Sequence, residues 1–158
     1  MNDDVARFAV PPLEKSVHVS CTPSRAFQAF TAEIGQWWPL ATHSVAQDQA
    51  RSVTIEPRVG GRVFETDAGG GQSDWGEVLE WAPPHRFAMS WHPGRAAASG
   101  QIVALTFVAE ASGTRVTLRH RGWESLGADA GKARESYDSG WESVFAGHFA
   151  GFCGSGRM

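Results

Sequence analysis

The segment Gly113-Thr-Arg-Val-Thr-Leu-Arg-His-Arg-Gly-Trp123 has the pattern of a turn, a strand and the end of that strand. After a short linker, residues 133–152 form one long amphipathic stretch that contains Gly140-Trp141. A late strand that leads into a long terminal helix is typical of a helix gripped by a curved antiparallel sheet. This ending therefore predicts an α+β fold with a cavity between sheet and helix, and the functional question becomes what that cavity holds.

The rest of the chain predicts a strand, a short helix and a run of antiparallel strands. Residues 13–21 alternate in polarity and form the first expected strand. Thr22-Pro23 then predicts a helix start, because Thr is a favoured N-cap and Pro fits the first helical position. Apolar residues recur at helical spacing from Ala26 to Ile34. Further strands, separated by turns rich in Gly and Pro, are expected at residues 53–57, 62–66, 74–81, 86–91, 101–110 and 114–121.

Length and composition narrow the class of protein. The 158 residues favour a single domain over residues 1–158, of which we expect residues 1–12 to be loose. The formal net charge of −3 and the lack of a basic run argue against a nucleic-acid partner. We expect no membrane segment and no secretory signal, because no apolar stretch has the required length or position. Cys21 and Cys153 show neither metal-ligand nor redox spacing, so we expect free thiols in a cytoplasmic protein.

Strand and helix periodicity predict which side chains face inward. His120 shares one side of its strand with Val116 and Leu118, opposite a row of arginines that we expect in solvent. Trp91 falls on an apolar side of its own strand. The terminal helix carries one apolar stripe, formed by Tyr137, Trp141, Val144, Phe145, His148, Phe149 and Phe152.

Four motifs, in this order along the chain, resemble a known family. They are Trp37-Trp38-Pro39, Gly60-Gly61, Gly76-Glu-Val-Leu-Glu-Trp-Ala-Pro-Pro84 followed by Arg86-Phe87, and residues 113–122 with Gly140-Trp141. The chain is similar to the START-like (SRPBCC) superfamily, which has the helix-grip fold of the birch-pollen allergen. Within it, the chain most resembles the Aha-type branch, named after an activator of the cytosolic heat-shock chaperone's ATPase.

The resemblance covers residues 17–149 and implies a helix-grip fold. In that fold a curved antiparallel sheet wraps around a long C-terminal helix, with a short helical segment after the first strand. The resemblance does not imply chaperone activation, because the eukaryotic activator has an additional chaperone-binding domain. Relatives elsewhere in the superfamily bind lipids, hormones or polyketides, and some act as cyclases.

Polar groups on the expected inward faces are the candidates for ligand contact or acid–base chemistry. His120, His148 and Tyr137 fall on such faces. The alternative for each histidine is a core residue hydrogen-bonded to the backbone. Glu77 ranks above Glu65, because alternation places it beside apolar neighbours, where a buried carboxyl has a raised pKa. A solvent-facing edge position is the default expectation for both glutamates, and this chemistry requires that one of them points into the cavity instead.

Aromatic residues are abundant, with seven Trp and nine Phe. Bulky rings fill cores as well as pockets, and we expect pocket walls at Trp91 and Trp141. We expect no metal and no cofactor, because the loop histidines His43, His85 and His92 lack metal-ligand spacing and are expected in solvent. The predicted ligand-binding set is Glu77, Trp91, His120, Tyr137, Trp141 and His148, with no catalytic residue assigned.

These observations predict that the chain is a small ligand-binding protein, monomeric or homodimeric. It would hold an apolar or aromatic small molecule between sheet and helix. One alternative is a cyclase or dehydratase in which His120, His148 or Glu77 moves protons. Another, implied only by the name of the branch, is a chaperone-associated protein of the stress response.

Overall fold

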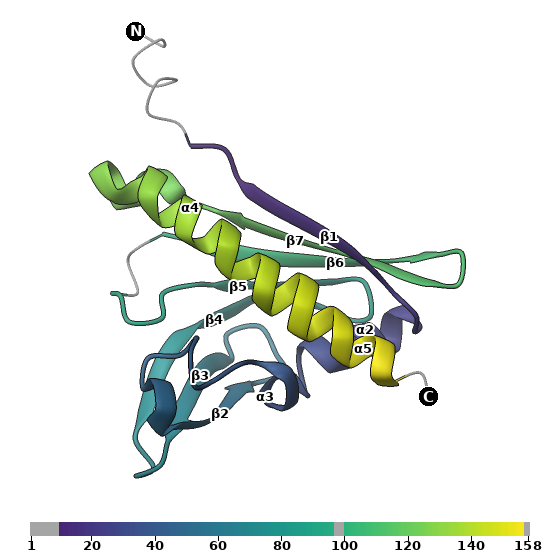
Figure 1. The fold of residues 1–158 in the computed structure, drawn as a ribbon, viewed down its shortest axis with the longest axis horizontal. Coiled ribbons are helices and arrows are strands. Elements are labelled where there is room, and N and C mark those ends of the chain that lie inside the picture. Colours follow the sequence, from purple (N-terminus) through teal and green to yellow (C-terminus); the bar gives the residue numbers. More distant parts are fainter. Residues whose placement is uncertain (1–9, 97–99, 157–158) are drawn as a thin grey trace, which may run out of the picture.

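A single antiparallel sheet and one long C-terminal helical segment form the structure, a computed structural model that describes residues 10–96 and 100–156 (Figure 1). The seven strands follow the order β1-β7-β6-β5-β4-β3-β2. Their bounds are β1 Leu13–Val19, β2 Ala50–Ile55, β3 Arg62–Asp67, β4 Gln72–Ala82, β5 Arg86–Ser90, β6 Ile102–Glu110 and β7 Gly113–Arg121. The helical elements are α2 Pro23–Phe30, α3 Ile34–Trp37, η1 Gln47–Gln49, η3 Trp123–Asp129, α4 Ala130–Trp141, η4 Glu142–Phe149 and α5 Ala150–Gly156. Figure 1 shows the terminal helix lying across the curved sheet, so the predicted α+β helix-grip fold is confirmed.

Helix α2 begins where the sequence predicts. The Thr22 Oγ1 atom accepts a hydrogen bond from the Arg25 amide at 3.1 Å, and Pro23 occupies the first turn. The helix buries Phe27 and Phe30 against the core. The short helix α3 follows, and its Trp37 indole nitrogen donates to the Ala29 carbonyl at 2.7 Å.

A bulge in β4 changes the expected facing of that strand. Val63 pairs with Gly76 and Phe64 pairs with Asp74, so Trp75 is an extra residue between two pairs. Such a bulge re-aims a side chain and shifts the alternation that follows it. Trp75 is fully buried, whereas Glu77 and Leu79 are exposed. The prediction that Glu77 shares an inward face with Trp75 is therefore wrong.

The terminal helix contains a π-helical section that rotates its apolar stripe. Over η4 the backbone forms a π-helix, in which hydrogen bonds join residues five apart in the sequence instead of four. A wider turn needs more residues to return to the same face, so Phe149 takes the inward position. His148 is exposed, and the prediction that it faces inward is wrong for this reason.

Most of the space between sheet and helix is filled by side chains. The Phe30 ring lies 5.3 Å from that of Phe149, and the Phe145 and Phe149 rings stack at 5.4 Å. Lys15 of β1 pairs with Asp138 and Glu142 of the helical segment. The predicted cavity is therefore restricted to one end of the interface.

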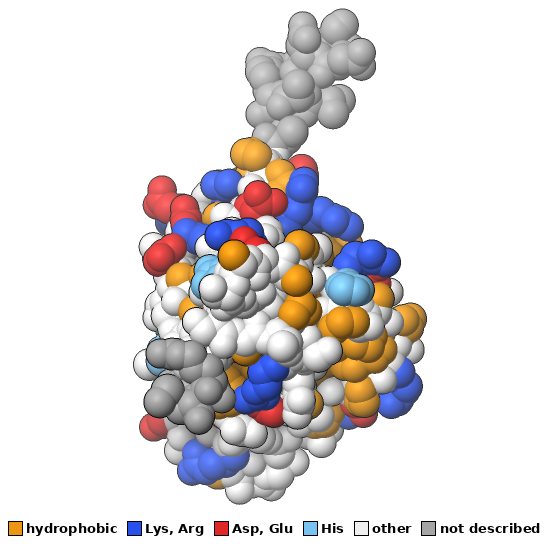
Figure 2. All heavy atoms as spheres, turned by 90° about the vertical axis from the view of Figure 1, so that its right-hand side faces the viewer, with side chains coloured by type: hydrophobic (Ala, Val, Ile, Leu, Met, Phe, Trp, Pro, Cys, Tyr) orange, Lys and Arg blue, Asp and Glu red, His pale blue; other side chains and the backbone are white. Residues whose placement is uncertain are grey.

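The expectation that residues 1–12 are loose lies largely outside the described residues, which begin at Val10. The Pro11 and Pro12 carbonyls accept hydrogen bonds from the Arg134 guanidinium at 2.8 and 3.0 Å. Within the described part of the chain, the helices lack the combined length and apolar character needed to cross a membrane. On the face seen in Figure 2, Lys and Arg side chains are interspersed with Asp and Glu.

Gly76 should tolerate no side chain, because a Cβ atom there would lie 1.8 Å from the Ser90 carbonyl oxygen. We expect Gly76→Ala to lower the free energy of unfolding by about 1–3 kcal/mol, since the backbone must move. Gly140→Ala is the control, because a Cβ atom at this helical position meets nothing within 4 Å. It should raise the free energy of unfolding by about 0.5–1 kcal/mol. Urea titration followed by circular dichroism measures both, and equal stability of the two variants would contradict the close approach of β4 and β5.

Candidate functional site

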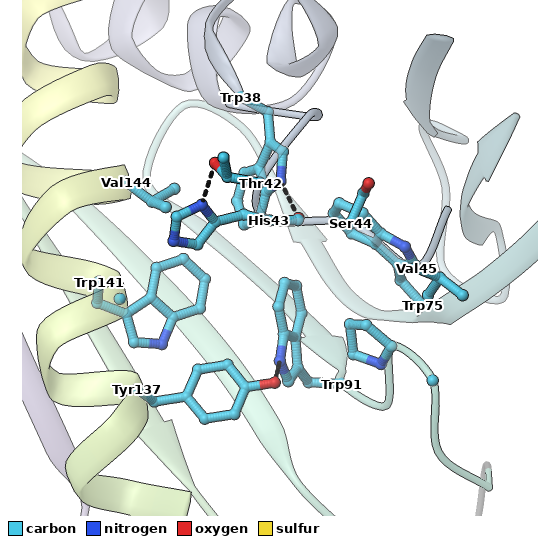
Figure 3. Close-up of a pocket in the computed structure, with 13 residues that line it drawn as sticks. Trp38, Thr42, His43, Ser44, Val45, Trp75, Trp91, Tyr137, Trp141 and Val144 are labelled. Carbon is cyan, nitrogen blue, oxygen red and sulfur yellow. Dashed lines mark hydrogen bonds between the residues drawn. The ribbon is translucent and has the colours of Figure 1, made fainter. Parts of the chain in front are cut away.

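A cavity of about 380 Å³ lies where the end of the sheet meets α4 (Figure 3). Its volume falls within the range of about 300–1,000 Å³ that is usual for small-molecule sites. Three parts of the chain line it: the sheet end, the terminal helix and the segment between α3 and η1. The lining residues are Trp38, Thr42, His43, Ser44, Val45, Trp75, Trp91, Pro93, Gly94, Tyr137, Gly140, Trp141 and Val144.

Four tryptophans pack against one another at this cavity, and we call the cavity the tryptophan-lined pocket. The ring centroids of neighbours lie 5.1 Å (Trp38–Trp75), 5.6 Å (Trp75–Trp91), 5.3 Å (Trp91–Trp141) and 5.8 Å (Trp38–Trp141) apart. Trp38 and Trp91 also lie 6.0 Å apart across the cluster. All four rings are at least nine-tenths buried. The rings are tilted or edge-on to one another, as aromatic groups prefer.

Each of the four indole N–H groups already donates to an acceptor of the protein. The acceptors are the His43 carbonyl for Trp38 (2.7 Å), Glu65 Oε1 for Trp75 (2.6 Å), the Tyr137 hydroxyl for Trp91 (3.1 Å) and His120 Nδ1 for Trp141 (3.0 Å). These bonds hold each ring in one orientation. The four indoles therefore offer ring faces and edges to a ligand, and their N–H donors are occupied.

His120 lies directly behind the pocket wall and is fully buried. The Trp141 indole can only donate, so Nδ1 accepts and the ring proton is on Nε2, which donates to Gln101 Oε1 at 2.8 Å. Burial lowers the pKa of His120 from its ordinary value of 6.5 to about 3. His120 is thus neutral, and it orients Trp141 from outside the pocket lining.

Tyr137 presents a hydroxyl at the edge of the pocket. Its oxygen accepts the Trp91 indole proton, and its own O–H has no acceptor among residues 10–96 and 100–156. Figure 3 shows this hydroxyl between the Tyr137 and Trp91 rings at the cavity. Tyr137 is therefore free to donate a hydrogen bond to an oxygen of a bound molecule.

A polar rim lies across the pocket from Tyr137. There the Thr42 hydroxyl and His43 Nδ1 are hydrogen-bonded at 2.8 Å, and both side chains are exposed. Ser44 also lines the cavity, and its hydroxyl donates to the Leu40 carbonyl. An imidazole beside a pocket can take up or release a proton.

The structure brings together part of the predicted set. Trp91, Tyr137 and Trp141 line the pocket, and His120 contacts the back of Trp141. Glu77 and His148 are exposed and are absent from the pocket lining, because of the β4 bulge and the π-helical turn described above.

The predicted ligand-binding set omitted Trp38, Trp75 and the segment 42–45. Trp37-Trp38-Pro39 stood out as a motif, and both rings are buried, but nothing local indicates that Trp38 is the one that lines the pocket. The prediction that His92 lies in solvent is wrong, since it is buried and its backbone amide donates to the Trp75 carbonyl at 2.6 Å. Over the described residues, no three His, Cys, Asp or Glu side chains are grouped to hold a metal ion.

Residues 20–151 match the protein family described as activator of Hsp90 ATPase homolog 1-like protein. The chain belongs to this family. The AHSA1-like protein from Aeromonas hydrophila has a similar structure, with a TM-score of 0.65 at 16% identity, covering 92% of this chain and 94% of the other. Protein MLL2253 from Mesorhizobium loti gives a TM-score of 0.61 at 19% identity, covering 87% of this chain and 93% of the other. At such identities these two likenesses concern the fold alone.

Another solved structure is similar to this chain at higher sequence identity. The chain is 31% identical to the anthrahydroquino-γ-pyrone synthase Txn09, complexed with SUM, with a TM-score of 0.63. The match covers 91% of this chain and 97% of that one. No match was found among the curated proteins. This AHSA1/polyketide cyclase-like fold is consistent with ligand binding or with cyclase activity.

The buried neutral His120 should make the protein sensitive to acid. Between pH 6.5 and about 3 the unfolded chain takes up a proton at this histidine and the folded chain does not, so stability falls as pH falls through this window. Each pH unit contributes at most about 1.4 kcal/mol. His120→Phe removes this contribution, so its free energy of unfolding should fall less steeply with acid than that of the wild type.

Denaturant titrations at several pH values measure the two slopes. His120→Phe should also be less stable near neutral pH, because the Trp141 N–H and the Gln101 oxygen lose their partner, at about 1–3 kcal/mol each. His148→Phe, at an exposed position, is the control and should keep the wild-type slope. Parallel slopes for His120→Phe and wild type would refute the neutral, buried state of His120.

Proposed function

We propose that this protein binds a flat, polycyclic aromatic molecule of polyketide type in the tryptophan-lined pocket. The observation that carries the proposal is the cluster of four indoles that lines the pocket and whose N–H groups are all bonded to the protein. Rings held in this way favour stacking and edge contacts with another aromatic system. They provide no donor for a polar aliphatic ligand.

The polar groups at the pocket fit an oxygen-bearing aromatic. The Tyr137 O–H can donate to a carbonyl or phenolic oxygen of the ligand, which fixes the ligand's orientation in the plane. Thr42, His43 and Ser44 offer further polar contacts at the opposite rim. The likeness to a pyrone synthase supports the same class of molecule, since the name of that protein denotes a fused aromatic hydroquinone and a pyrone ring.

Ring closure is the second candidate function, and one observation favours it: two groups able to move protons border the same pocket, Tyr137 and His43. A phenolic hydroxyl of a ligand would add to a conjugated carbon–carbon double bond. The double bond is conjugated with a carbonyl group, and the new carbon–oxygen bond forms as His43 accepts the phenolic proton. The pair of the double bond shifts toward the carbonyl carbon, and the carbonyl's own pair moves to its oxygen, which gives an enolate that Tyr137 stabilises. The proton then returns to carbon, so the reaction is an isomerisation without an oxidant.

Tyr137→Phe tests the binding proposal with 1,8-dihydroxyanthraquinone as the probe. The substitution removes the hydrogen bond to the probe and also the acceptor of the Trp91 N–H. The dissociation constant should therefore rise by about 2–10-fold, measured by quenching of tryptophan fluorescence. Trp81→Phe is the control, because Trp81 is half-buried and lines a separate groove beside Pro83 and Pro84. Binding that is weakened by Trp81→Phe and unaffected by Tyr137→Phe would place the probe in that groove and refute the proposed site.

His43→Gln tests ring closure with 2′-hydroxychalcone, whose cyclisation to flavanone is followed by absorbance. Loss of the proton acceptor should slow the catalysed rate by about 10²-fold or more. Binding of the anthraquinone probe should change by no more than about twofold, because only the polar rim is altered. His85→Gln, at an exposed histidine outside the pocket lining, should keep the full rate. A wild-type protein that does not accelerate the reaction, or equal rates for both variants, would count against cyclisation through His43.

A further inference from the structure

Glu65 is a buried carboxylate whose partners are all N–H donors. It lies on β3 and is 1% exposed. Its Oε1 atom accepts from the Val45 amide at 2.7 Å and from the Trp75 indole at 2.6 Å, and its Oε2 atom accepts from the Ala46 amide at 2.8 Å. None of the ion pairs among the described residues includes it. Burying a carboxylate is costly unless it is hydrogen-bonded, so these three bonds stabilise an otherwise unfavourable group.

The donors to Glu65 come from two adjoining parts of the lining of the tryptophan-lined pocket, the sheet and the loop (Figure 3). Trp75 is a wall residue on the sheet, and Val45 ends the segment of residues 42–45, which we call the loop wall. The other hydrogen bonds of residues 39–46, such as that of the Trp38 indole to the His43 carbonyl, stay within residues 38–49. Among the hydrogen bonds of residues 39–46, those of Val45 and Ala46 to Glu65 are therefore the ones that attach the loop wall to the sheet.

We propose that Glu65 is a positioning residue that holds the loop wall beside the Trp75 ring, and that this placement sets the width of the pocket between the loop wall and the terminal helix, which selects flat ligands over thicker ones. The selection of ligands rests on the proposed function, whereas the attachment of the loop wall does not. A carboxylate suits this role because both of its oxygens only accept hydrogen bonds.

The substitution Glu65→Gln keeps the size of the side chain and breaks the pattern of acceptors. One oxygen becomes an NH₂ group, which then faces the Ala46 amide or the pair of Val45 and Trp75 donors. At least one buried donor is left without an acceptor, so the loop wall should separate from the sheet. Glu77→Gln is the matched control, because it is the same chemical change at an exposed position on the neighbouring strand.

Hydrogen exchange in the unliganded protein tests the attachment directly. The Val45 and Ala46 amides should exchange at least ~10-fold faster in Glu65→Gln than in wild type, since the lost hydrogen bond releases the loop wall together with the adjoining Ala46. Amides of β6 and β7 should keep their protection, which separates a local opening from global unfolding. Glu77→Gln should match the wild type at every amide. Unchanged exchange at Val45 and Ala46 would overturn the proposal, whatever the ligand.

Ligand selectivity tests the second part of the proposal, the selection of flat ligands. The probes are 1,8-dihydroxyanthraquinone, which is flat, and 1-anilinonaphthalene-8-sulfonate, whose phenyl ring is twisted out of plane. The ratio of their dissociation constants should shift at least ~5-fold toward the twisted probe in Glu65→Gln, and should stay at the wild-type value in Glu77→Gln. An unchanged ratio would refute the selecting role.

The test still gives a result if the probes do not bind or if the variant does not fold. If the wild-type protein binds neither probe, the proposed function fails together with the selecting role, and exchange at Val45 and Ala46 alone decides the attachment. If Glu65→Gln does not fold, Glu65→Asp replaces it, because the charge is kept but the shorter chain cannot reach both Trp75 and the loop wall. It should give the same direction of change in exchange and in selectivity, and wild-type behaviour of Glu65→Asp would overturn the proposal.

Discussion

The four hydrogen bonds donated by the pocket indoles are the constraint on which the site depends. A buried indole N–H without an acceptor costs free energy, so each tryptophan must find a partner as the chain folds. The partners come from four separate places: the segment after α3, strand β3, strand β7 and helix α4. Satisfying these donors therefore brings the loop, the sheet and the helix into one arrangement and leaves a pocket with aromatic faces.

Two buried polar side chains support this arrangement from behind, and they use opposite chemistry. His120 is neutral and serves Trp141 as an acceptor through Nδ1, because burial in an apolar environment disfavours the imidazolium form. Glu65 is surrounded by N–H donors and serves Trp75 and the loop wall together. Neither residue lines the pocket, and both determine where its walls stand.

The location of the pocket follows from irregularities in otherwise regular elements. The bulge in β4 turns Trp75 inward at the end of the sheet, and the π-helical section begins just after Trp141. Elsewhere the interface between sheet and helix is packed by phenylalanine and aliphatic side chains, as in the contact of Phe30 with Phe149. A helix-grip protein of this size thus keeps a stable core and a small aromatic site in the same interface, because the two occupy different ends of the helix.

The sequence by itself determined the elements and their order. Thr22-Pro23 predicts the start of α2, the alternation around His120 predicts an inward-facing strand residue, and turn glycines mark the hairpins, since each of these depends on the local backbone. Part of the site was predictable in the same way, as Trp91, Tyr137 and Trp141 lie on apolar faces. Only the tertiary structure decided the rest. The positions of Trp75 and His148 depend on a bulge and a wide helical turn that break simple periodicity, and the roles of Trp38 and Glu65 depend on partners that are distant or unmarked in the sequence. Local patterns specify which face of an element is apolar, whereas the donors and acceptors that meet across elements are chosen only when the chain packs.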